Sequence, residues 1–177
     1  MSLERDTPPN RPEQRDYETG LADSAHLDLR VWLRLLTCTT LIERQIKRGL
    51  RGDFETTLPR FDALAQLDRA GGTMTMRELS SHMMVTNGNI TAIVDRLLED
   101  GFVVRRADPK DRRVHKVQLT DAGREFLATM IPVHNAWVSE AMAQVDEQDL
   151  AHLYKLLGQL KNSALQRDEE RDRESGR

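Results

Sequence analysis

The sequence contains a single cysteine, Cys38, which excludes an internal disulfide framework and any metal site built from several thiolates. It has no apolar run long enough to span a membrane, and its first residues, MSLERDTPPN, lack the apolar segment of a signal peptide. We therefore expect a cytoplasmic protein. Hydrophobic residues make up 38 % of the chain and aromatic residues only 5 %, which allows a modest core.

An excess of positive charge is also missing from the chain as a whole, whose formal net charge is −3. Residues 1–23 carry −3 and residues 166–177 carry −1, whereas residues 24–165 carry +1. Within that central part, Phe102–Lys116 holds six Lys or Arg and two Asp, a local charge of +4. Because phosphate binding depends on local clusters of charge, the total does not exclude a nucleic-acid partner.

The common motifs of catalysis are absent from the sequence. It contains no phosphate-binding glycine loop, no His-Glu-x-x-His pair and no Gly-x-Ser-x-Gly elbow. The carboxylates are numerous but scattered over polar helix faces, and no second His or Cys stands at metal-ligand spacing from His134. The sequence therefore predicts a protein that is not an enzyme and has no catalytic residue, cofactor or metal site.

Helical periodicity dominates the chain between two charged ends. We expect a disordered N-terminal arm over residues 1–22 and a charged C-terminal tail over residues 166–177. Apolar residues recur at helical spacing over 26–50, from 59 to the glycine pair at 71–72, over 75–83, 86–99 and 120–143, and from 146 onward. Segments 102–104 and 114–119 have the pattern of short strands. The predicted order is α-α-α-α-β-β-α-α, mainly α with a small β-hairpin (α+β).

Two short helices with a tight connection, followed at once by a basic hairpin, are typical of a winged helix-turn-helix. In such units the second helix enters the major groove of DNA, and residues near its N-terminus reach base edges. Here that end carries hydrogen-bonding side chains suited to bases, namely Thr86, Asn87, Asn89 and Thr91. Considered alone, these residues fit a simple helix cap equally well.

The hairpin favours DNA contact over simple capping. It crowds basic residues into one loop, where their repulsion is costly unless phosphates neutralise it: Arg105, Arg106, Lys110, Arg112 and Arg113. A run of charge usually marks a solvated face, but rarely one immediately beyond such a helix pair. We therefore predict double-stranded DNA as the partner, with a near-palindromic operator if the protein is a dimer.

Two stretches of the sequence resemble the MarR family of transcriptional regulators. Asp108–Gly123, DPKDRRVHKVQLTDAG, is similar to the family's wing motif D-x-R…L-T-x-x-G, and Val94–Phe102, VDRLLEDGF, is similar to its DRLE-x-x-G segment. The resemblance covers roughly residues 27–160. It implies a single winged helix-turn-helix domain over 23–165, with a DNA-binding lobe at about 56–120. The helices at about 24–52 and 121–165 would interlock in a homodimer.

The resemblance also assigns roles to single residues. Arg113 matches the wing-tip arginine placed in the minor groove, and Asp111 matches the aspartate that braces the wing. Thr86, Asn87, Asn89 and Thr91 match the base-reading positions of the family. Ala92 departs from the pattern, because many members carry a basic residue there, and this points to an altered sequence preference.

The resemblance further implies a repressor that releases DNA when a small, often aromatic, ligand binds. From Arg30 to Arg51 the first helix carries six basic residues and one acidic residue, Glu43. Three explanations stay open: a solvated face, peripheral phosphate contact, or an anionic ligand such as an aromatic acid or aromatic acyl-coenzyme A thioester. The His134-x-x-Trp137 pair resembles the branch that controls aromatic-acid breakdown. The candidate ligand-binding residues are Arg30, Arg34, Arg44, Arg48, His134 and Trp137.

Two alternatives to this function remain at the level of the sequence. Cys38 could act as a redox sensor, but it falls on the apolar stripe between Leu35 and Ile42, where thiols are usually inert packing residues. The chain offers no second cysteine to resolve a sulfenic acid. The other alternative is a helical protein-interaction adaptor that does not bind DNA.

Overall fold

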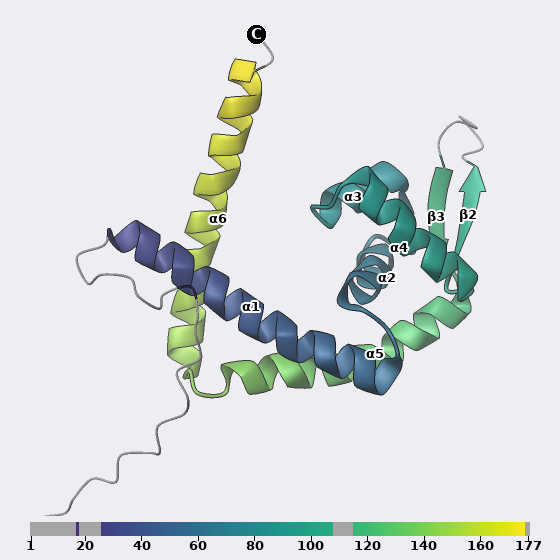
Figure 1. Cartoon of the computed structure of the whole chain (residues 1–177), viewed down its shortest axis with the longest axis horizontal. Coiled ribbons are helices and arrows are strands. Elements are labelled where there is room, and N and C mark those ends of the chain that lie inside the picture. Colours follow the sequence, from purple (N-terminus) through teal and green to yellow (C-terminus); the bar gives the residue numbers. More distant parts are fainter. Residues whose placement is uncertain (1–16, 18–25, 108–114, 176–177) are drawn as a thin grey trace, which may run out of the picture. The chain divides into compact units, whose positions relative to one another are not determined.

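The computed structural model describes Tyr17, residues 26–107 and residues 115–175. Its elements, labelled in Figure 1, are α1 (Leu27–Phe54), α2 (Leu58–Arg69), β1 (Thr73–Thr75), α3 (Met76–His82), α4 (Asn87–Glu99), β2 (Val103–Ala107), β3 (His115–Leu119), α5 (Asp121–Met142) and α6 (Glu147–Ser175). The chain divides into two compact units, with the boundary inside α5 between Asn135 and Ala136.

The predicted order of helices and hairpin strands is confirmed, and the structure adds one strand that the sequence did not predict. β1 pairs antiparallel with β3, with Met74 opposite Val117, so the sheet has the order β1-β3-β2. Three residues are too few to show an alternating pattern, and the partner strand lies some forty residues further along the chain. Local periodicity therefore missed β1.

The core of the first unit lies where α2 and α4 pack against the sheet and the start of α5. Its fully buried side chains are mainly aliphatic, as the low aromatic content predicts, and Phe61 is its one buried aromatic residue among the described residues. They include Leu64, Leu67, Leu79, Ile90, Val94, Leu97, Val117, Leu119 and Leu127. This core holds α3, α4 and the hairpin, which lie together in Figure 1, as one body.

The start of α5 explains the Leu-Thr-x-x-Gly part of the wing motif. The Thr120 hydroxyl accepts a hydrogen bond from the Gly123 N–H at 3.0 Å and donates one to the Gly101 carbonyl at 2.8 Å. A Cβ on Gly123 would collide with the Phe102 carbonyl oxygen and lie 2.9 Å from a methyl group of Leu119. Thr120 and Gly123 thus fasten α5 to the base of the hairpin.

The first half of α1, which the resemblance assigns to a dimer interface, leaves part of its apolar surface exposed in the single chain. Val31 and Trp32 are 46 % and 57 % exposed, and the stripe becomes buried only at Ile46 and Leu50. Cys38 is exposed as well, so its interpretation as a buried packing residue is wrong for the isolated chain. Periodicity shows that a stripe exists but not what covers it.

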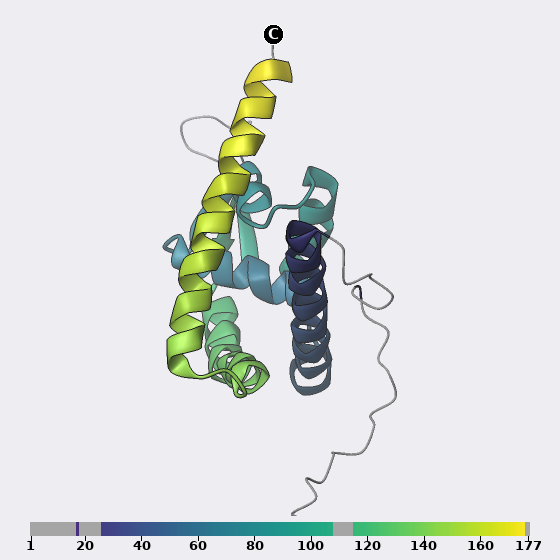
Figure 2. The ribbon, with the colours of Figure 1, turned by 90° about the vertical axis from the view of Figure 1, so that its left-hand side faces the viewer.

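The end of the chain also differs from the prediction. α6 continues through Ser175, so the segment expected to form a charged tail from residue 166 onward is helical. Figures 1 and 2 show α6 as one unbroken helix. Ion pairs at helical spacing join Arg167 to Glu170 and Arg173 to Glu169. Such i,i+3 and i,i+4 pairs favour the helix in a segment with few apolar residues.

Candidate nucleic-acid interface

The first helix of the reading pair, α3, begins with a reciprocal cap. The Thr75 hydroxyl accepts a hydrogen bond from the Glu78 N–H at 3.1 Å, and the Glu78 carboxylate accepts one from the Thr75 N–H at 2.7 Å. The Thr75 N–H, and to a smaller degree the Thr75 hydroxyl at 2.9 Å, donate to the Glu78 carboxylate and lower its pKa, because they favour its ionised form. The cap fixes where α3 starts and therefore where α4 follows.

The turn between α3 and α4 contains a backbone conformation that side chains rarely adopt. Met84 has a φ of 53°, and its side chain is 90 % exposed. Left-handed backbone costs free energy for any residue other than glycine. An exposed, strained residue at this turn is therefore typical of a functional segment, and not of a packing position.

The N-terminal end of α4 presents all four predicted base readers as exposed residues: Thr86, Asn87, Asn89 and Thr91. Three of them also serve the protein itself. The Thr86 hydroxyl accepts a hydrogen bond from the Asn89 N–H, the Asn87 side-chain oxygen accepts one from the Ser80 hydroxyl, and the Thr91 hydroxyl donates to the Asn87 carbonyl. The capping role that the sequence left open is thus real for Thr86.

Asn89 differs from these three, because its side-chain amide has no hydrogen-bond partner among the described residues. The neighbouring Gly88 is exposed, and a Cβ placed on it would meet nothing within 4 Å. Packing inside the described chain therefore does not require glycine at this position. Asn89 and Gly88 together offer a free amide and a bare stretch of backbone to an approaching ligand.

The described residues of the hairpin include part of the predicted basic surface. Arg105 and Arg106 are exposed on β2, and the Arg105 guanidinium pairs with the Asp95 carboxylate of α4 at 2.7 Å. This partly exposed ion pair links the hairpin to the reading helix with about 1 kcal/mol or less, and it offsets some of the repulsion expected among the arginines. Lys110, Asp111, Arg112 and Arg113 lie outside the described residues.

Sequence reasoning gave no role to Asp95 and Ser80, which position this site. Asp95 is part of the segment that resembles the DRLE-x-x-G motif. The motif therefore pointed to this residue, but it did not show that Asp95 pairs with Arg105. Ser80 is a buried residue of α3, and its hydroxyl shares its one proton between the Arg77 carbonyl at 2.9 Å and the Asn87 side-chain oxygen of α4 at 3.2 Å. The residues around Ser80 in the sequence do not predict its contact with Asn87.

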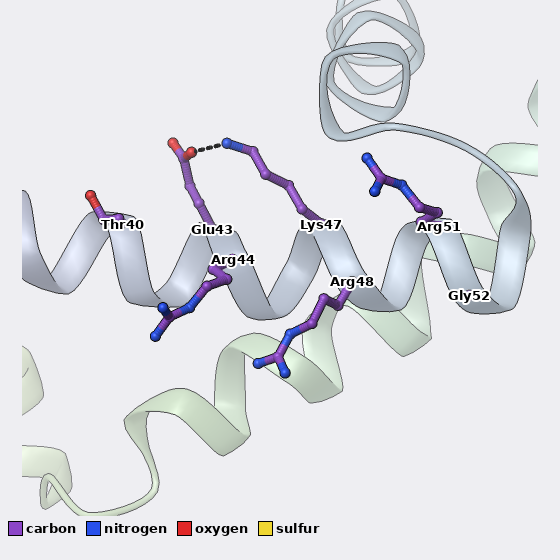
Figure 3. Close-up of a pocket in the computed structure, with 7 residues that line it drawn as sticks. All are labelled: Thr40, Glu43, Arg44, Lys47, Arg48, Arg51 and Gly52. Atoms are coloured by element: carbon purple, nitrogen blue, oxygen red, sulfur yellow. Dashed lines mark hydrogen bonds and ion pairs between the residues drawn. The ribbon is translucent and has the colours of Figure 1, made fainter. Parts of the chain in front are cut away.

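The candidate ligand residues of α1 separate into two places. Arg30 and Arg34 line a pocket of about 140 Å³ with Leu27 and Val31. Arg44 and Arg48 line a larger open pocket of about 510 Å³ along the second half of the helix. In Figure 3 their side chains extend from one side of α1, whereas Lys47 and its partner Glu43, 2.5 Å away, extend from the other.

Of the two remaining ligand candidates, His134 lines neither of these arginine pockets. His134 is half-buried, and its ring stacks on Phe61 with the ring centroids 4.6 Å apart. It lies near Asp62, whose pKa is raised mainly by burial and is lowered to a smaller degree by His134. Trp137 belongs to the second compact unit.

Other kinds of site find no support in the described part of the chain. Residues 17, 26–107 and 115–175 contain no group of three or more His, Cys, Asp or Glu side chains that could hold a metal ion. No helix among them is long and apolar enough to cross a membrane.

Comparisons of the sequence with known proteins point to one family. The MarR family profile matches residues 56–115. The chain is 30 % identical over 128 residues to an uncharacterised HTH-type transcriptional regulator of Bacillus cereus, which covers 72 % of this chain and 84 % of the relative. It is 35 % identical over 89 residues to the HTH-type regulator YkoM of Bacillus subtilis, which covers 49 % of this chain and only 58 % of YkoM.

Solved structures agree with the sequence comparisons. A MarR family regulator from Silicibacter pomeroyi is 32 % identical with a TM-score of 0.66, over 77 % of this chain and 94 % of that one. Sco3205 from Streptomyces coelicolor, solved with DNA, is 24 % identical with a TM-score of 0.71, over 80 % and 92 %. The organohalide-sensing regulator RdhR, solved with 2,4-dichlorophenol, is 22 % identical with a TM-score of 0.72, over 80 % and 83 %. The last two show a shared fold.

Proposed function

Because the chain belongs to the MarR family of transcriptional regulators, we propose that it binds a near-palindromic operator as a homodimer and represses transcription until a small anionic aromatic ligand releases it. Its family consists of regulators, and it is therefore not an enzyme. Reading of bases would fall to the N-terminal end of α4, with the basic hairpin holding phosphates.

The observation that carries DNA binding is the exposed end of α4 beside a basic strand. Asn89 offers an amide that the described residues leave unused, and Asn can pair with adenine through two hydrogen bonds. Arg105 and Arg106 are exposed on β2, which packs next to α4. Sequence-specific DNA recognition requires hydrogen-bonding groups that reach base edges and cations that bind phosphates, and this surface has both side by side.

The homodimer is supported by apolar surface that a single chain leaves in water. Helix α6 exposes Leu153, Leu156, Leu157 and Leu160, and α1 exposes Leu27, Val31 and Trp32. Helices that expose such stripes normally bury them against a partner. Two copies also suit a two-fold operator, with half-sites about 10 base pairs apart.

The ligand is proposed from the charge of α1. Arg44 and Arg48 extend from one side of the helix into an open pocket of about 510 Å³, and Arg51 also lines that pocket (Figure 3). Glu43 is the single carboxylate of this pocket and is paired with Lys47. The arginines therefore favour a carboxylate or phosphate group, as in an aromatic acid or an aromatic acyl-coenzyme A thioester.

The direct test is fluorescence anisotropy of the full chain on the DNA upstream of its own gene. We expect tight binding that weakens steeply with salt, because neutralised phosphates release counterions. Aromatic acids and their coenzyme A thioesters are then added, and one of them should release the DNA. Release that persists in Arg48→Ala would remove the arginines from the ligand site. An intact dimer that binds neither this DNA nor other promoters would favour the adaptor alternative.

Arg113→Ala provides a second test, although Arg113 lies outside the described residues. A wing-tip arginine does not support the core, so the variant should remain dimeric and bind DNA more weakly. Loss of the dimer, or unchanged affinity at every salt concentration, would contradict the assignment of the wing.

A further inference from the structure

The second half of α1 carries three arginines whose charge nothing in the described part of the chain neutralises. Arg44, Arg48 and Arg51 are exposed and line the open pocket of about 510 Å³. Their guanidinium groups have no ion-pair or hydrogen-bond partner among the described residues, and Glu43, the carboxylate of the pocket, is paired with Lys47. Like charges three and four residues apart on a helix repel each other. A group of negative charges lying across the arginines would offset that repulsion.

The chain contains a segment of the required sign directly before α1. Residues 16–23, DYETGLAD, hold three carboxylates and no Lys or Arg, and we call them the acidic segment. Of this segment the structure describes only Tyr17, which is 52 % exposed, as expected of a residue that stays at the surface. Charge and chain length therefore decide which part of the molecule the acidic segment can bind.

The spacing of the carboxylates matches the spacing of the arginines. Arg44 and Arg48 extend from the same side of α1 (Figure 3), and four residues of helix separate them by about 6 Å along the axis. In an extended chain, side chains two residues apart point to the same side and lie about 6.5 Å apart. Asp16 and Glu18 have that separation in sequence. Two carboxylates can therefore meet two guanidinium groups in register.

The chain between the acidic segment and α1 is long enough for this contact. Since the segment directly precedes α1, it has to run back along the helix in the antiparallel direction. From Leu27, the helix rises about 26 Å to Arg44 and about 32 Å to Arg48. An extended chain spans up to about 30 Å from Leu27 back to Glu18 and about 36 Å back to Asp16. Glu18 thus reaches Arg44, and Asp16 reaches Arg48.

We propose that the acidic segment binds back along α1 and competes with anionic ligands for the arginine pocket. In this contact Glu18 pairs with Arg44, and Asp16 pairs with Arg48. A ligand that finds its site free for only a fraction of the time binds with an affinity reduced by that fraction. The contact itself requires neither DNA nor an effector. Its consequence, a higher ligand concentration for release of DNA, rests on the proposed function.

The first test measures the affinity of the full chain for inorganic pyrophosphate by calorimetry at low salt. Asp16→Asn combined with Glu18→Gln removes both charges and keeps the size of the side chains. We expect this neutralised variant to bind pyrophosphate about five- to ten-fold more tightly than the parent, because the pocket is no longer occupied. Equal affinities of parent and neutralised variant would overturn the proposal.

A matched control separates competition from the change in total charge. Asp172→Asn combined with Glu174→Gln removes two exposed carboxylates from the second compact unit and should bind pyrophosphate within about two-fold of the parent. The same gain in this control as in the neutralised variant would show that total charge, and not the acidic segment, sets the affinity.

Arg48→Ala in the neutralised variant distinguishes failure of the inference from failure of the anion site. We expect this change to weaken pyrophosphate binding at least about five-fold. If it does so while the neutralised variant binds no tighter than the parent, the acidic segment is not a competitor and the anion site stands. If Arg48→Ala has no effect, or if the neutralised variant does not bind pyrophosphate at millimolar concentration, the arginines are not an anion site and both ideas fail.

The contact is also observable without any added anion. In NMR spectra of the full chain, the backbone amide signals of residues 16–18 should shift when Arg44→Ala and Arg48→Ala are introduced together. Pyrophosphate added to the parent should move the same signals in the same direction, because both changes release the segment. Lys161→Ala, which removes an exposed cation of α6, should leave them in place. Signals that do not respond to the loss of the two arginines would overturn the proposal.

Discussion

Asn89 shows at the scale of one residue how a helix terminus can serve both folding and recognition. Its backbone N–H donates to the Thr86 hydroxyl, whereas its side-chain amide has no hydrogen-bond partner among the described residues. The two roles are therefore separable by mutation. A change to the side chain leaves the cap in place and removes only what would face DNA.

We predict that Asn89→Ala relaxes base preference at one position in each half-site. The loss should amount to about 1–3 kcal/mol on the preferred sequence, the usual value of a good two-hydrogen-bond contact to a base. Anisotropy on the operator and on its single-base variants measures the effect. Asn162→Ala, an exposed change of the same type on α6, is the control and should leave base preference unchanged. An equal loss on all sequences would show that Asn89 does not read a base.

Asp62 is a residue whose ionisation opposes folding. Burial, reinforced by Glu43, raises its pKa above the ordinary value of 3.8, although His134, Arg69 and Lys47 act in the opposite direction. The folded chain therefore holds this proton more tightly than the unfolded chain. The ionised group costs stability at neutral pH, and the cost disappears as the pH falls through the raised pKa toward 3.8.

We predict that Asp62→Asn raises the melting temperature at pH 7 and that its advantage shrinks as the pH approaches 4. Thermal melts of parent and variant across this range provide the measurement. Asp68→Asn, an exposed change on the same helix, controls for the loss of one negative charge. An advantage that does not vary with pH would assign the effect to something other than the ionisation of Asp62.

At the scale of elements, the junction between hairpin and α5 depends on the absence of a side chain at Gly123. A Cβ there would overlap the backbone oxygen of Phe102, which also accepts a hydrogen bond from the Thr120 N–H at 3.0 Å. Backbone cannot move aside as the end of a flexible side chain can. We predict that Gly123→Ala destabilises the protein by about 1–3 kcal/mol, the usual cost of overpacking.

Urea denaturation measures that loss, and Ala128→Gly offers a contrast. Ala128 is exposed within the same helix, so its change tests only helix propensity, with an expected cost of up to about 1 kcal/mol. Alanine has a higher helix propensity than glycine, and Gly123→Ala should nevertheless lower the stability of the protein. A stability equal to that of the parent would show that the junction can relax.

In the turn between α3 and α4, a residue with a side chain, Met84, adopts a left-handed backbone conformation that suits glycine better. We predict that Met84→Gly leaves the fold unchanged and raises stability by up to about 1 kcal/mol, since the left-handed strain outweighs the added freedom of the unfolded chain. If the exposed methionine also touches DNA, affinity falls while stability rises. A loss of stability would mean that the Met84 side chain packs in the functional state.

These elements show what the sequence could and could not predict. Helix starts at Thr75 and Thr86 were predictable, because a hydroxyl at the N-cap acts within its own few residues. β1 was not, because its pairing with β3 is long-range. The candidate base readers were identified by type and position, but only the structure separates Asn89 from the three that hydrogen-bond within the protein. Phe54, Phe102 and Phe126 line one pocket, and no local pattern brings residues so far apart in the sequence together.

At the scale of the whole molecule, the exposed apolar residues of α6 link assembly to DNA binding. Leu153, Leu157 and Leu160 recur at spacings of four and three residues and are each 38 % to 48 % exposed in the single chain. Burial in a dimer would stabilise it by roughly 25 cal/mol for each Å² removed from water. A dimer held in this way should melt at a temperature that rises with protein concentration.

We predict that Leu157→Glu shifts the protein toward the monomer and weakens operator binding more than it weakens binding of a single half-site. A charge inside an apolar interface loses its water without gaining a partner, so the dimer is destabilised. Binding of a single half-site needs only one copy of the protein and should be affected less. Gln159→Glu, two residues away and exposed, adds the same charge outside the leucine stripe and should change neither property. Light scattering gives the mass, and anisotropy on full and half operators gives the two affinities. If Leu157→Glu stays dimeric, the stripe of α6 is not the interface. If it is monomeric yet keeps full operator affinity, the two-fold operator itself is wrong, because only a dimer gains from joining two half-sites.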